Sequence, residues 1–169
     1  MTDTESPAAS LAPLPERVGP RPPTTQGMPH TQIGVEPVLE VNAELYRRAF
    51  QLPGVTNRPT VVSVPGARGL WLDEAMPLAN PEVIVAGREF THIHPDGSMH
   101  LTLPAERARE AIATGWAELH PIARQIGQEG LVLVYTPRSF DELEVLWTLV
   151  LDAYQYVTGL PRPAPRRPT

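Results

Sequence analysis

Apolar residues recur at intervals of three and four along the stretch that follows Ser139, which is the spacing of one face of a helix. Ser139 and Glu142 begin this stretch as a capping box, in which the serine accepts an amide hydrogen bond and the glutamate reaches back. Gly159 ends the pattern, as glycine commonly does after a helix. The apolar positions are Leu143, Leu146, Trp147, Val150, Leu151, Tyr154 and Val157. The pattern predicts a long C-terminal helix that is the main packing surface for a sheet.

Shorter apolar or alternating runs predict the remaining elements. We expect strands at residues 60–64, 70–72, 82–86 and 131–135, an extended segment at 116–121, and helices at 42–50 and 105–114. Strands joined mostly by hairpins, with helices at the sides, are typical of the α+β class. The predicted fold is therefore an antiparallel sheet packed against the long C-terminal helix and one or two shorter helices.

Two alternating runs, residues 88–94 and 98–103, meet at the turn Pro95-Asp96-Gly97. A proline, a polar residue and a glycine favour a type I turn closed by a left-handed glycine, which makes a three-residue hairpin loop. This loop places His92 opposite His100. A two-residue loop would shift the register by one and send His100 to the other face.

Side chains alternate across a strand, so the hairpin has one histidine-rich face and one mostly apolar face. The first face is expected to carry Phe90, His92, His94, Ser98, His100 and Thr102. Arg88 shares this face in the predicted register. The hairpin therefore resembles a core wall on one side and the floor of a site on the other.

Both ends of the chain lack such patterning. Residues 1–30 hold seven of the 21 prolines and almost no apolar periodicity, and residues 160–169 are similar. Segments of this composition do not bury enough apolar surface to offset the entropy lost on ordering. We therefore expect disordered proline-rich tails at 1–30 and 160–169 around one domain at 31–159.

Composition narrows the chemistry and the partners. The chain has no cysteine, and its 14 basic residues are all arginine, which excludes thiol nucleophiles, Schiff bases and lysine-dependent phosphate loops. Net charge is −5 with no basic face, which argues against nucleic acid. No apolar run is long enough to cross a bilayer, and the N-terminus lacks a signal pattern. We expect a cytoplasmic protein that binds a small molecule, without a nucleic-acid or membrane partner.

Histidine is the reactive side chain that remains, and the hairpin allows three interpretations. His92, His94 and His100 are placed to bind a divalent metal, although a turn replaces the carboxylate ligand that often follows such a pair. Clustered imidazoles can instead stay neutral and act as bases near neutral pH. In the third interpretation they are sheet residues bonded to neighbours or water.

Further candidates lie downstream of the hairpin. In an extended segment, Trp116, Glu118 and His120 share a face, so His120 is a fourth candidate base and the other two can contact a substrate. Arg88 and Arg138 can face an anionic group. The alternative is a structural role: a core position for Trp116, a turn position for His120, an ion pair for Arg88 and a solvated surface for Arg138.

The order of these motifs matches a known family. The motifs are Arg88-Glu89, His92-x-His94, His100-Leu101, Gly115-Trp116-x-x-x-His120-Pro121 and Tyr135-x-Pro137-Arg138. Together they resemble the fungal luciferase domain and the bacterial proteins of the luciferase family. The resemblance spans residues 80–158, in order and at near-equal spacing.

The resemblance implies an oxygenase. The fungal enzyme oxidises 3-hydroxyhispidin, a styryl-pyranone, with molecular oxygen and no known organic cofactor, through a peroxide that loses carbon dioxide. It implies here a base that deprotonates an acidic enol, with molecular oxygen as co-substrate, no cofactor, and a metal not excluded. The matching bases are His92, His94, His100 and His120. Arg88 would stabilise the developing oxyanion, and Trp116, Glu118 and Arg138 would complete the substrate site.

The chain also departs from the fungal pattern. A proline-rich polar stretch stands where the fungal protein carries an N-terminal membrane segment. Richness in alanine, proline and arginine without lysine suggests a bacterial source, in which the fungal luciferin pathway is unexpected and the substrate is expected to differ. What the resemblance implies is then a related substrate, an enolisable hydroxypyranone or a polyketide-like molecule. The alternatives are a metal-dependent enzyme with His92, His94 and His100 as ligands, and a non-catalytic small-molecule binder.

Overall fold

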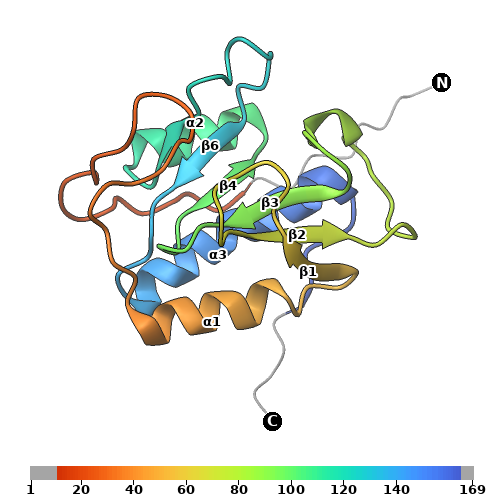
Figure 1. Cartoon of the computed structure of the whole chain (residues 1–169), viewed down its shortest axis with the longest axis horizontal. Coiled ribbons are helices and arrows are strands. Elements are labelled where there is room, and N and C mark those ends of the chain that lie inside the picture. The colour runs from red at the N-terminus through yellow and green to blue at the C-terminus, as the bar shows by residue number, and fades with distance from the viewer. Residues whose placement is uncertain (1–10, 165–169) are drawn as a thin grey trace.

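The computed structural model describes residues 11–164. This part of the chain forms a six-stranded antiparallel sheet with the strand order β1-β2-β3-β4-β6-β5, together with three α-helices (Figure 1). The elements are α1 (Leu39–Ala49), β1 (Val55–Pro59), β2 (Arg68–Leu72), the 3-10 helix η1 (Pro81–Val83), β3 (Glu89–Ile93), β4 (Met99–Thr102), α2 (Ala105–Ala113), β5 (Ala117–Leu119), β6 (Leu131–Val134) and α3 (Phe140–Thr158). The predicted α+β class is confirmed.

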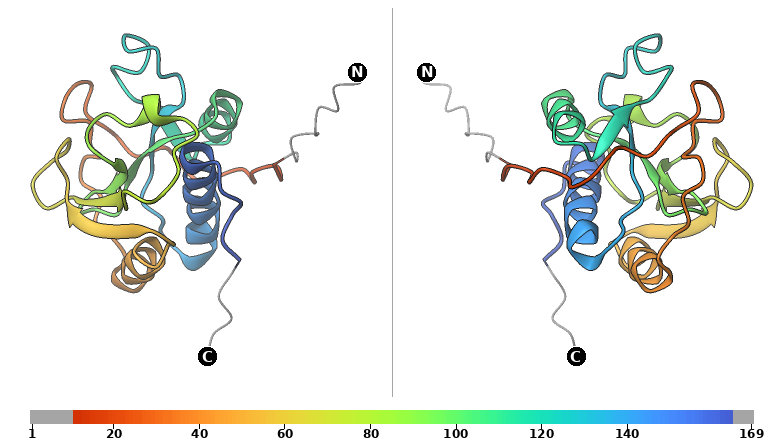
Figure 2. Two further views of the ribbon diagram at one scale, coloured as in Figure 1. Left: turned by 90° about the vertical axis from the view of Figure 1, so that its right-hand side faces the viewer. Right: turned by 90° about the vertical axis from the view of Figure 1, so that its left-hand side faces the viewer.

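Helix α3 covers one face of the sheet, as its apolar spacing predicts (Figure 2). Ser139 is the N-cap and accepts a hydrogen bond from the Glu142 amide at 3.2 Å, and Gly159 ends the helix with a φ of 73°. Only half of the predicted capping box forms, because the Glu142 carboxylate accepts from the amide of Arg138 at 2.8 Å instead. The buried face of α3 is the largest part of the core.

The hairpin has the predicted register. His92 pairs with His100, and the amide of His94 donates to the carbonyl of Ser98 at 2.9 Å. Gly97 closes the three-residue loop with a φ of 88°, a conformation that side chains with a Cβ rarely adopt. The turn therefore holds the imidazoles of β3 and β4 on the face of the sheet that α3 does not cover.

A β-bulge changes which residues of β3 face the histidines. Leu70 pairs with Thr91, but the next residue, Trp71, pairs with Glu89, so Phe90 is the extra residue. The ring of Phe90 lies 6.1 Å from that of Tyr154 in α3. The expectation that Phe90 shares the histidine face is wrong, and Glu89 takes that place.

Two predicted strands have other structures. Residues 82 and 83 belong to η1 rather than to a strand. The proline ring of Pro81 restricts the φ angle of that residue and favours the start of a 3-10 turn. Residues 60–64 form a loop, and the edge strand is the more polar β1 just before them. Both strands were predicted from their apolar content. That criterion fails here, since the edge of the sheet is largely exposed and needs no apolar run.

The N-terminal segment, residues 11–38, lies against the domain rather than forming a tail (Figure 2). Leu14 is 9% exposed within the core. The Trp116 indole donates to the carbonyl of Pro15 at 2.6 Å, and Arg107 donates to that of Ala12 at 2.9 Å. The tail prediction is thus wrong for residues 11–30, because an extended proline-rich segment offers carbonyl acceptors that apolar periodicity does not reveal. Residues 1–10 lie outside the described part.

The C-terminal end shows the same behaviour where it is described. Arg162 forms an ion pair with Asp152, which is buried in α3 and also bonds Arg107 at 2.8 Å. Residues 160–164 therefore contact α3, and the rest of the predicted tail, 165–169, lies outside the described residues. No helix among residues 11–164 is both long and apolar enough to cross a membrane.

The packing of residues 11–30 predicts a specific loss of stability. Leu14→Ala should lower the free energy of unfolding by about 2 to 3 kcal/mol, because it leaves a cavity in the core. Leu11→Ala is the matched control, since Leu11 is 37% exposed, and should change stability by less than about 0.5 kcal/mol. Urea unfolding measures both, and an equal, small effect of the two substitutions would show that the segment is a tail.

Candidate functional site

All five histidines of the chain gather in one buried cluster, with His100 at its centre. The ring of His100 lies 4.7 Å from that of His94, 4.8 Å from His120, 5.0 Å from His92 and 5.4 Å from His30, measured between centroids. None of the five is more than 9% exposed. The four predicted catalytic histidines are thus brought together, and a fifth joins them.

The fifth histidine, His30, comes from the N-terminal segment. It is 2% exposed, its ring stacks on that of His100, and its Nδ1 lies 3.3 Å from His100 Nε2. Nearby, the side chain of Gln32 bonds both the amide and the hydroxyl of Thr136, at 3.0 and 2.7 Å, which holds the segment in place. Sequence reasoning missed His30 because it stands in a stretch without periodicity. One signal in the sequence pointed to it: the chain has only five histidines, and three of them already share the predicted face of the hairpin.

Glu89 is the second residue that sequence reasoning missed. Its Oε1 lies 3.2 Å from His92 Nδ1, and its side chain is 1% exposed. It also accepts hydrogen bonds from the Thr60 hydroxyl at 2.6 Å and from the amide of Val61 at 3.0 Å. Burial alone would raise the pKa of Glu89, but the bonds from His92, Thr60 and Val61 hold that pKa below its usual value. Glu89 is therefore an ionised carboxylate that orients His92.

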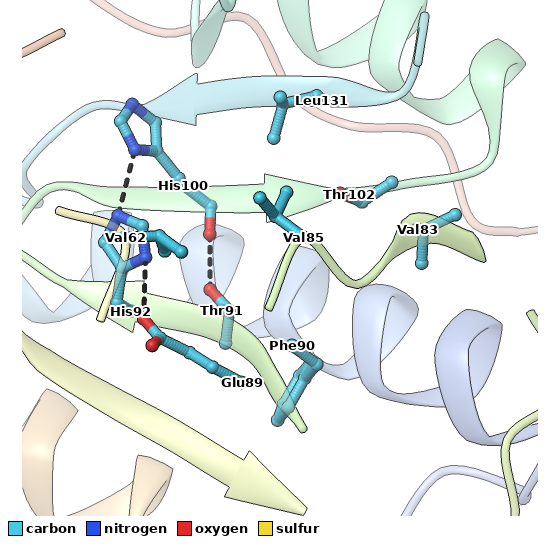
Figure 3. Close-up of a pocket in the computed structure, with 10 residues that line it drawn as sticks. All are labelled: Val62, Val83, Val85, Glu89, Phe90, Thr91, His92, His100, Thr102 and Leu131. Atoms are coloured by element: carbon cyan, nitrogen blue, oxygen red, sulfur yellow. Dashed lines mark hydrogen bonds and ion pairs between the residues drawn. The ribbon is translucent and has the colours of Figure 1, made fainter. Parts of the chain in front are cut away.

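His92 has two polar contacts, one to Glu89 and one to His100. His92 Nε2 lies 3.0 Å from His100 Nδ1, as the dashed lines of Figure 3 show together with the Glu89 contact. At the far side, His30 Nε2 lies 3.5 Å from Oε2 of Glu118, so this expected substrate contact adjoins the cluster. A carboxylate thus stands at each end of three imidazoles.

Burial keeps four of the imidazoles neutral. Loss of solvent lowers the pKa of His94 to about 4 and that of His120 to about 4, with neighbouring imidazoles adding to both effects. It also lowers the pKa of His30 and holds that of His100 well below its usual value. Neutral rings donate with one nitrogen and accept with the other, so each of these four rings has an acceptor nitrogen near neutral pH.

Three predicted substrate contacts do not reach the cluster. The Arg88 guanidinium donates to the carbonyls of Leu72 and Asp73 at 2.9 Å each and to that of Met76 at 2.6 Å. Arg138 pairs with Glu142 and donates to a carbonyl of the N-terminal segment. Trp116 is buried against that segment. Arg88 is displaced because the bulge at Phe90 reverses the alternation on which its placement relied.

A small pocket opens onto the Glu89 end of the cluster (Figure 3). Its lining residues are Val62, Val83, Val85, Glu89, Phe90, Thr91, His92, His100, Thr102 and Leu131. Apolar side chains form most of the wall, and Glu89, His92 and His100 are its titratable groups. Such a pocket suits the edge of a flat apolar molecule that carries one acidic hydrogen.

The histidines also form two groups compact enough to hold a metal ion. Ring nitrogens of His92, His94 and His100, and likewise of His30, His100 and His120, lie within 4.8 Å of one another.

In the first group, however, all six ring nitrogens already have partners. His94 bonds the hydroxyls of Ser98 at 2.9 Å and Ser63 at 3.1 Å. His92 and His100 bond each other, and their remaining ring nitrogens face Glu89 and His30 respectively. A metal would have to break these bonds, so the arrangement favours proton chemistry.

Fold and site together define a small α+β domain with a buried imidazole cluster beside an apolar pocket. Residues 87–153 match the family model described as the luciferase domain. The chain is 29% identical over 171 residues to luciferases of Armillaria mellea and Armillaria ostoyae, which covers 89% of this chain and 64% of each relative. A luciferase of Neonothopanus nambi is 29% identical over 108 residues, or 56% of this chain and 40% of the relative.

These comparisons show that residues 87–153 match the luciferase domain and that the chain is similar to fungal luciferases, as its motifs predict. The chain spans 64% of the length of the Armillaria luciferases. No solved structure matches it. These relatives are fungal, and the bacterial source stays a prediction from composition.

The low pKa values predict a stability that depends on pH. The ordinary histidine pKa of about 6.5 applies to the unfolded chain, whereas that of His120 is about 4 in the fold. The folded state therefore binds fewer protons, and stability is fully present above about pH 6.5 and lost as the pH falls toward 4. His120→Gln should reduce the slope between about pH 6 and about pH 5 by at most about 1.4 kcal/mol per pH unit. Urea unfolding at a series of pH values measures it, and an unchanged slope would contradict the buried, neutral state of His120.

The occupied ring nitrogens predict indifference to chelators. Treatment of the purified protein with EDTA followed by dialysis should leave its melting temperature unchanged, because hydrogen bonds rather than a metal hold His92, His94 and His100. Elemental analysis before and after treatment is the control. Stoichiometric metal in wild type that is lost on His94→Ala, with a fall in melting temperature after EDTA, would establish the metal interpretation instead.

Proposed function

We propose that this domain is a luciferase-like oxygenase that acts on an enolisable hydroxypyranone or polyketide-like small molecule. The proposal is supported by the named relatives, which are luciferases. The observation that carries it is the Glu89–His92 pair at the apolar pocket, because this pair is a base held ready beside a site for a flat molecule.

The base acts first. Glu89 accepts the Nδ1 hydrogen of His92 and so fixes the tautomer in which Nε2 is the basic nitrogen. That nitrogen faces His100, and both rings line the pocket. The enol O–H bond of the substrate breaks, and its proton joins the imidazole cluster, which leaves an enolate in the pocket. General bases of this kind contribute roughly 10²- to 10⁴-fold to a rate.

Oxygen reacts second. The enolate gives one electron to molecular oxygen, which yields superoxide and a substrate radical, and these two combine to form a carbon–oxygen bond and a peroxide. The substrate radical and superoxide each supply one electron to the new carbon–oxygen bond, so the step needs no external reductant. The proposal therefore includes no organic cofactor.

The enolate needs a nearby positive charge, and Arg88 is committed to three main-chain carbonyls. The proton that the substrate releases supplies this charge, because it makes the histidine cluster cationic directly beneath the pocket. Deprotonation thus creates an ion pair in a buried site, where electrostatic attraction is stronger than in water. The cytoplasm remains the expected location.

Oxygen consumption tests the proposal. Full-length protein mixed with 3-hydroxyhispidin, and with simpler hydroxypyranones, should consume oxygen in an electrode cell, and His92→Gln should slow this consumption by about 100-fold or more. Glu129→Gln is the control, since its side chain is 70% exposed and it belongs neither to the histidine cluster nor to the lining of the pocket. Light emission is recorded in parallel.

Two outcomes would contradict the proposal. If no hydroxypyranone supports oxygen uptake while calorimetry detects binding, the domain is a non-catalytic binder. If His92→Gln retains the wild-type rate, the Glu89–His92 pair is not the base.

A further inference from the structure

Glu89, His92, His100, His30 and Glu118 form a row in which ring nitrogens and carboxylate oxygens face one another at 3.0 to 3.5 Å, and we call it the imidazole row. Its first two links are Glu89 Oε1 to His92 Nδ1 at 3.2 Å and His92 Nε2 to His100 Nδ1 at 3.0 Å. The other two are His100 Nε2 to His30 Nδ1 at 3.3 Å and His30 Nε2 to Glu118 Oε2 at 3.5 Å. Each imidazole uses one ring nitrogen toward each neighbour, so the row is unbranched.

The number of protons does not match the number of links. Three neutral imidazoles carry three N–H protons, and an ionised carboxylate has none to give. The row has four links, so one link lacks a proton whenever the imidazoles are neutral. One additional proton fills all four links at once. The row is therefore built to take up one proton.

The missing proton has an identifiable place. Glu89, already bonded to Thr60 and Val61, holds the Nδ1 hydrogen of His92. If His100 and His30 also carry their hydrogens on Nδ1, the link without a proton is the one at Glu118. His30 Nε2 is indeed buried without a hydrogen-bond partner among the described residues.

The two ends of the row face different surroundings. Glu89 lines the pocket, and its side chain is 1% exposed. The side chain of Glu118 is 28% exposed and accepts a hydrogen bond from the Thr24 hydroxyl at 3.0 Å. The row thus connects the pocket to a group that solvent reaches.

We propose that the imidazole row is a proton relay that passes one proton between the pocket and Glu118. Its use in this way rests on the proposed function, because the relay carries the proton that an acidic substrate releases.

From the state with its hydrogens on Nδ1, the row first passes a proton inward: Glu118 gives a proton to His30 Nε2, each Nδ1 hydrogen moves to the next group, and Glu89 receives the last one. This transfer leaves the hydrogens on Nε2, and transfer toward Glu118 starts from that state. A proton from the pocket passes from Glu89 to His92 Nδ1, where a new N–H bond forms. The Nε2–H bond of His92 then breaks, and that proton moves to His100 Nδ1. The same exchange follows from His100 Nε2 to His30 Nδ1 and from His30 Nε2 to Glu118. Every hop breaks one bond to hydrogen and forms another. The row is therefore cationic while the proton is in transit, and it is neutral, with its hydrogens on Nδ1, once Glu118 has received the proton.

The groups that surround the middle of the row do not compete for this proton. His94 and His120 contact the ring of His100, and burial lowers the pKa of each to about 4, so both stay neutral. Asp96 accepts a hydrogen bond from Ser98, which bonds His94, and so acts on His94 rather than on the row.

The solvent end has its own neighbours. Tyr135 is close to Glu118, and burial together with that carboxylate raises its pKa to about 12, so it remains neutral. Arg21 is the nearby cation; it donates to the carbonyls of Ala117 and Ile112. Neither group replaces Glu118 as the acceptor at the end of the row.

Imidazole ¹⁵N NMR of the full chain tests the relay, because the ¹⁵N shifts report which ring nitrogen holds the hydrogen. In Glu89→Gln, the negative charge that favours hydrogen on Nδ1 is removed, so His30, two imidazoles away, should shift toward the Nε2–H form. In Glu118→Gln, loss of the carboxylate at the far end of the row should weaken uptake of the extra proton at His100 by about tenfold. Glu129→Gln is the control and should leave both signals unchanged.

Either remote response supports the relay. If His30 keeps its tautomer in a folded Glu89→Gln protein, the row is not coupled and the proposal is wrong. The proposal is also wrong if that variant does not fold and the titration of His100 is the same in Glu118→Gln as in the control. The measurement needs no substrate. A coupled row in a protein that consumes no oxygen would therefore overturn the proposed function alone.

Discussion

The whole site depends on one extra residue in β3. The bulge at Phe90 sends an aromatic ring to α3 and turns Glu89 toward the histidines. Without it, regular alternation would place Phe90 beside His92 and bury a carboxylate in the core, where an unpaired charge is costly. The bulge thus serves packing and chemistry together: it supplies the core with a ring and gives the imidazoles an anionic partner.

Burial of so many imidazoles has a compensating arrangement. Five polar rings are buried, and each needs hydrogen-bond partners to offset the free energy lost when its nitrogens leave water. The partners come mostly from within the cluster and from hydroxyl groups such as those of Ser63 and Ser98. A neutral cluster follows, and neutrality is also what a base requires. Stability and reactivity therefore place the same demand on this part of the fold.

Much of the fold and part of the site could be predicted from the sequence, because they depend on helix periodicity and on turn geometry. Apolar spacing located α3, and the turn ending at Gly97 set the register that pairs His92 with His100. Glu89 and the retreat of Arg88 could not be read, since a bulge is set by pairing with β2 and leaves no periodic trace. His30 was missed for another reason: its segment packs through main-chain carbonyls, which every sequence has.

The origin of His30 bears on how the molecule is made. During synthesis, the N-terminal segment leaves the ribosome before any strand of the sheet, yet Gln32 bonds Thr136, which is 104 residues further along. The segment must therefore wait, extended, until nearly the whole domain has emerged. Contacts of such long sequence separation form late and slowly, because a large loop must close first. The cluster is in consequence incomplete until the last strand is in place, so a partly made chain cannot carry out its chemistry.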